Sequence, residues 1–574
     1  MTALTIALAE EIGNPDLFIG RKQELDFYLK WAHGSKDLLS KSQALLSRRK
    51  KGKTALVQRL FNILYSQADP KLIPFFFRVP ERPLSTVGFG LEFYRTFLSQ
   101  YLGFTRREPK LINDLLGMSE LKEWVKDDPY LSRDILRMEE AMATAPESVW
   151  SHAQAAPHRF ATFHDIRIVQ IIDEFQYMNR FIYNDSALTS QVDLCHSYMG
   201  LAESKYAPLI VTGSYIGWLT TILNHMTARF RDRELLSLSD EEALEAVYNY
   251  AGISGRPVTE TTAAYIAKVA YNDPFYLSQI VLTDQPDLDL TTEAGVRTAL
   301  QFETTYGQGF VAKIWMEYIA EGLKRVNDTN GKKIVLYLAK HGQEECSREQ
   351  IHKDLKLKIS DDQLAERLFK LQKADLIAKG SSAFRFKGLG DPIFAAVFRK
   401  HYAEEIERVP MHSVAEAFEQ EMQSLKGEVA QLKGQAGEYR VMYFLLLATA
   451  RGAKPDQVIF HPVDGFTLNG FTNMKKKTFY RNNTNSDEMD IHASSKDPNG
   501  MDLIVEVKNW KGRVSNKVVE TFIEQKNRLV LERNTAFLFY SENGFTENQE
   551  QLLRANHIMY TTFEKLTGGI PSGS

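Results

Sequence analysis

The most constraining feature of this sequence is a short apolar segment, residues 43–46, that runs through the loop 47–54 into a helical segment at 54–65. Strands that alternate with helices form a mostly parallel sheet covered by helices. The sequence therefore predicts an α/β domain over residues 1–240, with a helical insertion at about 104–158, where strand patterns are missing. Further apolar segments typical of strands lie at 74–79, 166–172 and 208–212.

The loop 47–54 reads Ser-Arg-Arg-Lys-Lys-Gly-Lys-Thr, which matches the pattern G-x-x-x-x-G-K-[ST] except that Ser47 replaces the first glycine. Backbone N–H groups at the start of a helix can surround phosphate oxygens, and loops of this kind bind nucleotides in that way. We expect the small Ser47 to let the loop close together with Gly52. Lys53 is predicted to reach the β- and γ-phosphates, and Thr54 to bind Mg²⁺.

An acidic pair, Asp173 and Glu174, follows the buried segment 166–172. One carboxylate at this position can hold Mg²⁺ and the next can activate water, so Asp173 is predicted to bind the ion and Glu174 to act as the base. Both residues also suit the N-cap of a helix. The next predicted strand leads to Ser214, whose hydroxyl could sense the γ-phosphate.

Together with the segment 18–25 (Phe-x-Gly-Arg-x-x-Glu-Leu) and the segment 272–277 (Asn-Asp-Pro-Phe-Tyr-Leu), these motifs resemble the archaeal-type ATPases, relatives of the STAND and AAA+ P-loop ATPases. The resemblance covers about residues 15–400, and Asp273 departs from the family's G-N-P-F-Y-L segment. It implies a P-loop NTPase fold with ATP and Mg²⁺ as cofactors. It also implies a homo-oligomer, or a partner protein bound through the ATPase and winged-helix region.

Residues 241–330 have a helical pattern throughout and are predicted to form the lid, and residues 331–405 predict a winged helix. The expected helices are 332–340, 347–354 and 361–374, and the expected hairpin strands are 376–379 and 384–387. Basic side chains in this unit could contact a DNA backbone, or the unit could serve only for packing. These side chains are Arg367, Lys370, Lys373, Lys379, Arg385 and Lys387.

Three arginines, Arg229, Arg231 and Arg233, lie between Ser214 and the predicted lid. Arg229 or Arg231 would suit a finger that reaches the γ-phosphate on a neighbouring subunit, and structural ion pairs are the alternative. Residues 406–434 predict a linker helix, whose apolar side chains repeat at spacings of four and three. This seam is either a short coiled coil or a helix packed on its own neighbours. It consists of Phe418, Met422, Leu425, Val429 and Leu432.

The C-terminal region, 435–574, contains the string D-x15-E-V-K, formed by Asp490, Glu506 and Lys508. Hydrolysis of a phosphodiester needs a divalent cation, and Mg²⁺ prefers carboxylate oxygens. The strand period of two places Glu506 and Lys508 on one face and turns Val507 to the core. Asp490 and Glu506 are predicted to bind the metal, and Lys508 to orient water or neutralise charge. The alternative is an ion pair on an exposed strand.

This region resembles the PD-(D/E)XK restriction-endonuclease-like superfamily, in particular its Mrr-type branch. The resemblance rests on a leading helix, 437–450, on the strings E-M-D-I and I-V-E-V-K-N-W, and on the strand 536–540 with the S-E-N-G-F string after it; Met489 replaces the usual proline. It implies that Glu438 is a third acidic group and Gln525 a substrate-side residue. Mg²⁺ is the expected metal, with Mn²⁺ as the other candidate, and Val507 completes the predicted ligand set.

A basic segment, Lys475–Lys477 with Arg481, is predicted to be a loop beside this site, where it would contact a phosphate backbone or simply be solvated. Phe479 and Tyr480 lie within it. We interpret the chain as an ATPase and Mg²⁺-dependent endodeoxyribonuclease in which nucleotide controls cleavage, and the resemblances suggest defence against foreign DNA. The alternatives are a scaffolding ATPase whose C-terminal region only binds nucleic acid, and a nuclease of DNA repair or of a mobile element.

The composition limits the classes of protein to which the chain can belong. A length of 574 residues exceeds what one hydrophobic core supports, so several domains are expected. A formal net charge of −3 restricts nucleic-acid contacts to local basic patches. Cys195 and Cys346 lie far apart, which argues against disulfides and favours the cytoplasm. The acidic N-terminal segment argues against a signal peptide, and the longest apolar run, 441–447, is too short to span a membrane.

Overall fold

The computed structural model describes residues 4–571 except 215, 227–228, 306, 324–328, 383, 408–424, 469, 481–485 and 509–511. The chain forms two compact units, which are described separately. The first comprises Met1–Leu238, Asp273–Gln279 and Gln301–Glu419. The second comprises Ser239–Asn272, Ile280–Leu300 and Gln420–Ser574.

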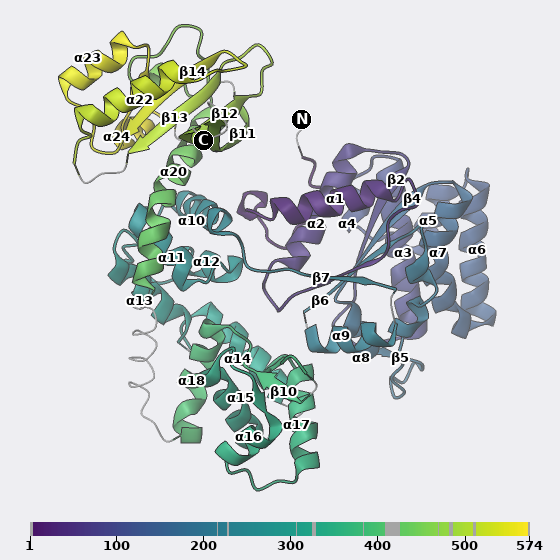
Figure 1. Ribbon diagram of the computed structural model, residues 1–574. Coiled ribbons are helices and arrows are strands. Elements are labelled where there is room, and N and C mark those ends of the chain that lie inside the picture. Colours follow the sequence, from purple (N-terminus) through teal and green to yellow (C-terminus); the bar gives the residue numbers. More distant parts are fainter. Residues whose placement is uncertain are drawn as a thin grey trace. The chain divides into compact units, whose positions relative to one another are not determined.

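Five parallel strands form the main sheet of the first unit, in the order β2-β4-β6-β1-β7 (Figure 1). The four strands predicted from apolar segments are confirmed, each within two residues of its expected bounds. Because the strands are parallel, the segments that follow them emerge at one edge of the sheet. The strand bounds are β1 Gln43–Leu46, β2 Leu72–Arg78, β4 Arg167–Asp173, β6 Leu209–Gly213 and β7 Arg231–Glu234.

The edge strand β7 has no apolar pattern in the sequence. Its residues read Arg-Asp-Arg-Glu and lie mostly exposed, so the alternation that predicts a half-buried strand is missing. Main-chain pairing with β1 holds this strand in the sheet instead. Hydrogen bonds of the backbone do not depend on side-chain type, and a charged edge strand also resists pairing with other chains.

Helices pack on this sheet and confirm the helical character of residues 104–158. Helices α3 (Thr86–Thr105) and α7 (Val149–Phe163) pack on each other, on β2 and on β4, so both ends of the predicted insertion belong to the layer that covers the sheet. Aromatic rings fill this interface, where Phe75 meets Phe93 and Phe97 edge-to-face at 5.2 Å between centroids. Other helices of this part are α1 (Lys22–Gly34), α2 (Lys53–Gln67), α4 (Lys110–Asn113), α5 (Met118–Val125) and α6 (Pro129–Thr144).

Residues 329–407 form a smaller part of the first unit, with helices followed by a hairpin as predicted. The hydroxyl of Ser347 accepts a hydrogen bond from the backbone N–H of Gln350 at 3.1 Å and so caps the second helix. The sequence did not indicate the two-residue strand β8, which pairs with the hairpin. The elements are α15 (Thr329–His341), β8 (Cys346–Ser347), α16 (Arg348–Asp354), α17 (Asp361–Lys373), β9 (Ala378–Lys379), β10 (Arg385–Lys387) and α18 (Pro392–Glu407).

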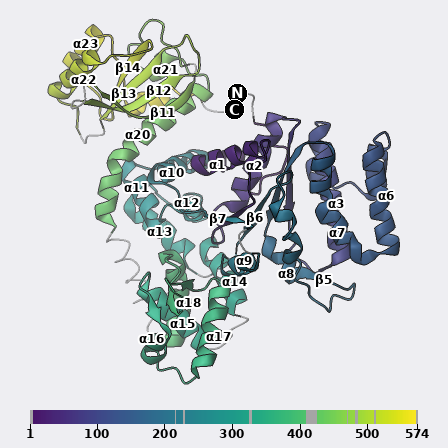
Figure 2. The same cartoon turned by 45° about the vertical axis from the view of Figure 1, so that its right-hand side comes forward.

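The predicted lid region consists of helices joined by loops, and one long helix packs on two of these helices. Helix α20 (Lys426–Ala450) packs along α10 (Asp240–Ser254) and α11 (Glu260–Val269) (Figure 2). The linker and the leading helix of the C-terminal region, predicted as separate helices, are therefore continuous from Lys426. Val429 and Leu432 of the predicted seam are buried, whereas Phe418 and Met422 lie outside the described residues. Further helices are α12 (Pro274–Val281), α13 (Glu293–Glu303) and α14 (Phe310–Leu323).

The C-terminal region contains a mixed sheet in the order β11-β12-β13-β14-β15. The first three strands pair antiparallel and the last three parallel. Helix α20 contributes Val441 to the apolar cluster that includes Val505, and α22 contributes Phe522 to a second cluster that includes Ile504. Val507 lies in the first cluster, as predicted. The elements are β11 (Phe471–Tyr480), β12 (Ser486–Ser495), β13 (Asp502–Lys508), α22 (Asn516–Arg528), β14 (Thr535–Ser541), α23 (Glu547–Ala555), β15 (Met559–Thr561) and α24 (Phe563–Gly568).

The prediction of a basic loop at 475–477 is wrong, because these lysines belong to strand β11, which pairs with β12. The run of three lysines hid the strand, since it interrupts any apolar alternation. Arg481 lies outside the described residues. Cys195 and Cys346 are both free and buried. Within the described ranges, no helix is long and apolar enough to cross a membrane.

Candidate nucleotide and metal sites

The loop between β1 and α2 closes around the amine of Lys53. This amine donates hydrogen bonds to the carbonyl oxygens of Ser47 at 2.6 Å and Arg48 at 2.9 Å. Gly52 precedes the helix with a φ of +87°, a conformation that glycine adopts without strain. Within residues 47–54, positive φ occurs only at Lys50 and Gly52, so position 47 does not require a glycine. The substitution of Ser47 for the usual glycine therefore leaves the loop closed.

The predicted Mg²⁺ ligands of the first unit lie in contact with each other. The hydroxyl of Thr54 donates a hydrogen bond to Asp173 Oδ2 at 2.9 Å, and the hydroxyl of Thr212 donates to the other oxygen of the same carboxylate. Asp173 is the last residue of β4 and is fully buried. A carboxylate and a hydroxyl so placed, at the start of α2, can share one divalent cation.

Glu174 lies beside this pair with its backbone in the left-handed region, at a φ of 56°. Its Oε2 accepts hydrogen bonds from the hydroxyl of Ser214 at 2.8 Å and from the amide of Gln176 at 2.6 Å. Glu174 occupies the N-cap position of the 3-10 turn that follows, but its side chain makes no capping hydrogen bond there. The strained backbone and the defined partners are typical of a functional position.

Burial shifts the pKa values of the ionisable groups around the loop. It lowers the pKa of Lys53 to about 8, with the nearby carboxylates Glu174 and Asp173 opposing the shift. Burial and the adjacent charge of Asp173 raise the pKa of Glu174 above its usual range. The ammonium of Lys53 would be stabilised by additional negative charge, and the carboxylate of Glu174 is more basic than one in water.

Two other basic residues of the loop form ion pairs with buried carboxylates. Arg48 pairs with Asp391 at 2.7 Å, and Lys51 pairs with Asp273 at 2.5 Å. At position 273 the carboxylate of Asp273 provides the counter-charge for Lys51. Single-sequence reasoning missed both carboxylates, because neither lies near the loop in the sequence.

We expect the substitution Lys51→Met to destabilise the first unit by about 3–5 kcal/mol, because it leaves Asp273 charged and buried without its partner. The double substitution with Asp273→Leu should recover most of that loss. Urea unfolding followed by intrinsic fluorescence measures both effects. As a control, Lys30→Met removes an exposed pair with Asp26 and should change stability by no more than about 0.5 kcal/mol. Equal losses from the two single lysine substitutions would contradict the role of the buried pair.

A further carboxylate missed by sequence reasoning, Asp375, follows helix α17 and meets the start of α9 (Ile216–His225). Its Oδ1 accepts a hydrogen bond from the backbone N–H of Gly217 at 2.8 Å. Burial raises its pKa to about 7. Because α9 begins two residues after Ser214, Asp375 ties the end of α17 to the helix that follows the predicted γ-phosphate sensor.

The candidate finger arginines make contacts within their own chain. Arg229 Nε donates a hydrogen bond to the carbonyl oxygen of Met199 at 3.0 Å, and the guanidinium of Arg233 lies 3.9 Å from the centroid of the Phe27 ring. Arg231 belongs to β7, where its backbone N–H donates to Ser42. These contacts favour the structural alternative for Arg229 and Arg233.

In the second unit, the string D-x15-E-V-K forms one group of side chains on adjacent strands. Lys508 Nζ lies 2.5 Å from Glu506 Oε1 and 3.6 Å from Asp490 Oδ2. Asp490 Oδ2 also accepts a hydrogen bond from the backbone N–H of Val507 at 2.7 Å, and the carbonyl oxygen of Val507 accepts one from Lys508. The structure therefore brings Asp490, Glu506 and Lys508 together.

A shift in strand register places Asp490. Lys475 pairs with His492 and Lys477 with Met489, so two residues of β12, Asp490 and Ile491, oppose one residue of β11. This count is that of a β-bulge, which turns one side chain out of the strand's alternation. In a regular strand, residues two apart point to the same face of the sheet. Met489 and Ile491 instead belong to different apolar clusters, as expected for a bulge between them. The bulge directs Asp490 to β13, and no feature of the sequence indicated it.

The predicted third acidic group, Glu438, comes from α20 and is linked to this site through charge. Burial and the nearby charge of Asp490 raise the pKa of Glu438 to about 7. Lys476 Nζ, from the strand opposite the bulge, lies 3.7 Å from Glu438 and 3.3 Å from Glu488. Among the described residues, no group of three histidines, cysteines or carboxylates is arranged to hold a metal. Two carboxylates with water can hold Mg²⁺, so Asp490 and Glu506 remain a chemically suitable pair.

No known protein-family model and no curated protein matches the chain. Among solved structures, it is similar to the Walker-type ATPase PABY2304 of Pyrococcus abyssi, at 15% identity and a TM-score of 0.43, covering 67% of this chain and 96% of that one. It is also similar to the ORC2 protein of Aeropyrum pernix, at 12% identity and a TM-score of 0.36, covering 72% of this chain and 98% of that one. The RuvB branch-migration motor of Thermotoga maritima is similar at 14% identity and a TM-score of 0.30, covering 68% of this chain and 97% of that one. Since all three TM-scores are below 0.5, the interpretation of the sites depends on the residues described above.

Proposed function

We propose that the first unit binds and hydrolyses ATP with Mg²⁺ in the loop 47–54, and that the C-terminal sheet of the second unit cleaves DNA phosphodiesters. The observation that carries the nuclease proposal is the meeting of Asp490, Glu506 and Lys508 at a bulged strand. The resemblances to STAND- and AAA+-related ATPases and to Mrr-type nucleases support the same assignment. Mn²⁺ is an alternative ion for the nuclease site.

At the nucleotide site, the backbone N–H groups of the loop and the ammonium of Lys53 bind the phosphates. Thr54 and Asp173 would hold Mg²⁺, which when bound would supply positive charge to the phosphate oxygens. Glu174 accepts a proton from the attacking water, and its raised pKa suits that task. Ser214, which is bonded to Glu174, connects this base to the end of β6.

At the nuclease site, Asp490 and Glu506 would hold the metal, which when bound would supply positive charge to the scissile phosphate and to a water. Lys508 stabilises the negative charge that develops on the phosphate, and the backbone of Val507 contributes to the ligand set. Glu438, with its pKa of about 7, can exchange a proton near neutral pH. In this proposal the side chain of Gln525, on α22, contacts the substrate.

Control of cleavage by nucleotide is part of the proposal, and α20 is the element that supports it. Arg440 on this helix is buried and pairs with Glu260 at the start of α11. The same guanidinium donates a hydrogen bond at 2.8 Å to the hydroxyl of Tyr540, at the end of β14, and lies 3.3 Å from Glu542. Glu438 lies two residues earlier on the helix. A displacement of α11 would therefore be transmitted to the helix that carries Glu438.

The proposed setting is defence against foreign DNA in the cytoplasm, by a homo-oligomer or with a protein partner. The test is cleavage of plasmid, single-stranded DNA and RNA by the full-length protein with Mg²⁺ or Mn²⁺, each with ATP, ADP or no nucleotide. We expect metal-dependent cleavage of DNA at rates that differ about tenfold between ATP and ADP. Equal rates in all three nucleotide states would contradict the control of cleavage, and cleavage of RNA alone would contradict the choice of DNA.

The variant Arg440→Met tests the path along α20. It should retain metal-dependent cleavage and lose the difference between ATP and ADP, because it breaks the contact with Glu260. Arg451→Met is the matched control, since Arg451 is the C-cap residue of the same helix and its side chain donates a hydrogen bond to the exposed carbonyl oxygen of Pro571. A normal nucleotide response in Arg440→Met would exclude this path.

A further inference from the structure

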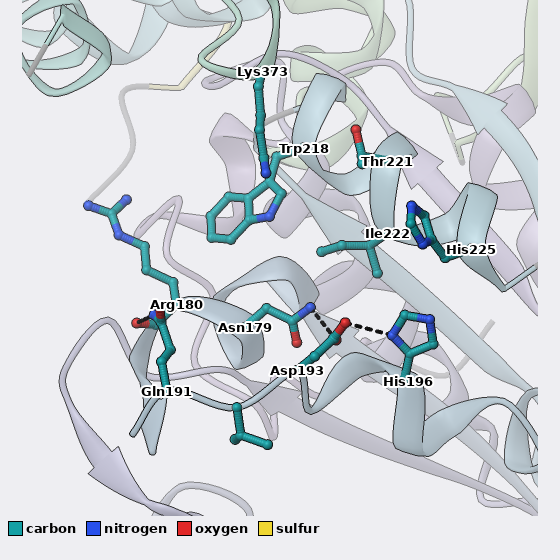
Figure 3. A pocket seen from close by; sticks show the side chains of 11 residues that line it. Asn179, Arg180, Gln191, Asp193, His196, Trp218, Thr221, Ile222, His225 and Lys373 are labelled. Atoms are coloured by element: carbon teal, nitrogen blue, oxygen red, sulfur yellow. Dashed lines mark hydrogen bonds and ion pairs between the residues drawn. The ribbon is translucent and has the colours of Figure 1, made fainter. Parts of the chain in front are cut away.

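A pocket of about 490 Å³ opens in the first unit between α9, the segment 179–196 and the end of α17 (Figure 3). None of the nucleotide-site residues described above lines it. One wall is a single face of α9, because the lining residues Trp218, Thr221, Ile222 and His225 follow the helical spacing of three, four and seven. The pocket is therefore built by regular secondary structure on at least one side.

The α9 wall includes the aromatic ring of Trp218, which is mostly buried and meets the pocket with a small part of its surface. In Figure 3 the indole of Trp218 lies at the pocket, with Ile222 on the next turn beside it. The indole also packs against the ring of Tyr177, at 6.3 Å between ring centroids. An aromatic ring beside an aliphatic side chain suits a planar ligand group, since stacking is worth about 1–3 kcal/mol per nucleic-acid base.

Positive charge flanks this aromatic surface. Lys373, the last residue of α17, extends toward Trp218 in Figure 3, and it makes no ion pair with any described residue. Arg180 lines the same pocket and pairs with Glu321. Asp193 is the single carboxylate among the lining residues, and the ring of His196 and the amide of Asn179 both bond to it. Arg180 shares its charge with Glu321, and both oxygens of Asp193 already accept hydrogen bonds, so the ammonium of Lys373 is the cation that favours an anionic ligand.

Hydrogen-bonding groups complete the lining. Gln191 donates its amide N–H to the carbonyl oxygen of Arg180, which leaves the amide oxygen of Gln191 as an acceptor. The imidazole of His196 bonds to Asp193 through Nδ1, and its second ring nitrogen and the nearby ring of His225 add polar groups on the other side. A ring to stack, cations for an anion, and amide and imidazole groups for a polar edge together match a base joined to a phosphate.

We propose that this pocket binds a nucleotide unit, with the base on Trp218 and the phosphate between Lys373 and Arg180. The unit is either a free nucleotide or part of a single-stranded nucleic acid. The site is separate from the loop 47–54, so the proposal stands independently of the proposed function. A ligand here touches both α9 and α17, the two elements joined by the contact of Asp375 with Gly217. Its binding therefore stabilises the segment that follows Ser214.

The test uses full-length protein carrying Lys53→Ala, so that the loop does not contribute to binding. One arm measures radiolabelled AMP by equilibrium dialysis, and the other measures a fluorescein-labelled ten-residue oligothymidylate by fluorescence anisotropy. In at least one arm we expect Lys373→Ala and Trp218→Leu each to weaken binding about tenfold, from the loss of a charge-assisted contact or of stacking. Trp218 is largely buried, so Trp218→Leu could fail to fold. In that case His225→Ala, at an exposed position of the same wall, replaces it and should also weaken binding.

Lys370→Ala is the matched control, because Lys370 lies on the same helix, pairs with Glu366 and is not part of the pocket lining. It should leave binding unchanged. A response of AMP to Lys373→Ala identifies a free nucleotide as the source, and a response of the oligonucleotide alone identifies a single strand. Absence of binding in both arms, or binding that Lys373→Ala weakens no more than Lys370→Ala, overturns the proposal.

Discussion

The substitution Glu506→Gln is expected to reduce Mg²⁺-dependent DNA cleavage by about a thousandfold. The amide keeps the size of the side chain but removes one of the two carboxylate charges that would hold the cation. A bound metal supplies several kcal/mol of transition-state stabilisation, and each 1.36 kcal/mol corresponds to a factor of ten in rate. Lys508→Met should cause a loss of at least about a hundredfold, since one donor aimed at developing charge has that effect in other enzymes.

The measurement is the initial rate of plasmid nicking and linearisation with purified full-length variants. Glu524→Gln is the matched control: it makes the same chemical change on α22, where Glu524 is 68% exposed and pairs with Arg528. It should cleave within about twofold of the wild type. If Glu506→Gln and Lys508→Met cleave as fast as Glu524→Gln, the activity does not come from this site and the nuclease proposal fails.

The sequence predicted the parts of the fold that leave an apolar pattern. Strands β1, β2, β4 and β6 of the first sheet are buried on both faces, so their apolar segments stand out between helices. The three helices and the hairpin of residues 331–405 were also predictable, because caps such as Ser347 and Ser360 mark where helices start. Strand β7 and the lysine-rich part of β11 were missed, since pairing through the backbone held them despite charged side chains.

For the candidate sites, short-range spacing predicted the residues and the fold supplied their arrangement. Glu506 and Lys508 share a strand, so a period of two suffices to place them on one face. The orientation of Asp490 depends on a bulge, and the bulge depends on the register with β11, which one sequence does not reveal. Lys51 with Asp273 and Gly217 with Asp375 are contacts between distant segments. Their residues could be found only after the helices had been placed.

Lys53→Ala is expected to weaken ATP binding by at least about a hundredfold, because the ammonium would make charge-assisted bonds to two phosphates at about 1.5–3 kcal/mol each. The wild-type protein should also show a characteristic pH dependence. Burial lowers the pKa of Lys53 to about 8, and bound phosphates favour its protonated form. Below pH 8 the amine is already protonated, so affinity is constant with respect to this group. Above pH 8 binding must take up a proton, so the dissociation constant rises by up to tenfold per pH unit.

Calorimetric titration with ATP at pH 7, 8 and 9, in buffers of different ionisation enthalpy, measures both the affinity and the proton uptake. Lys53→Ala should remove the proton uptake above pH 8 together with most of the affinity. Lys71→Ala, which removes an exposed lysine of the same unit, should retain both. Undiminished binding by Lys53→Ala would show that ATP binds elsewhere. Weak binding without any pH dependence in the wild type would show that the amine of Lys53 does not meet the phosphates, because contact with an anion and a lowered pKa together require that linkage.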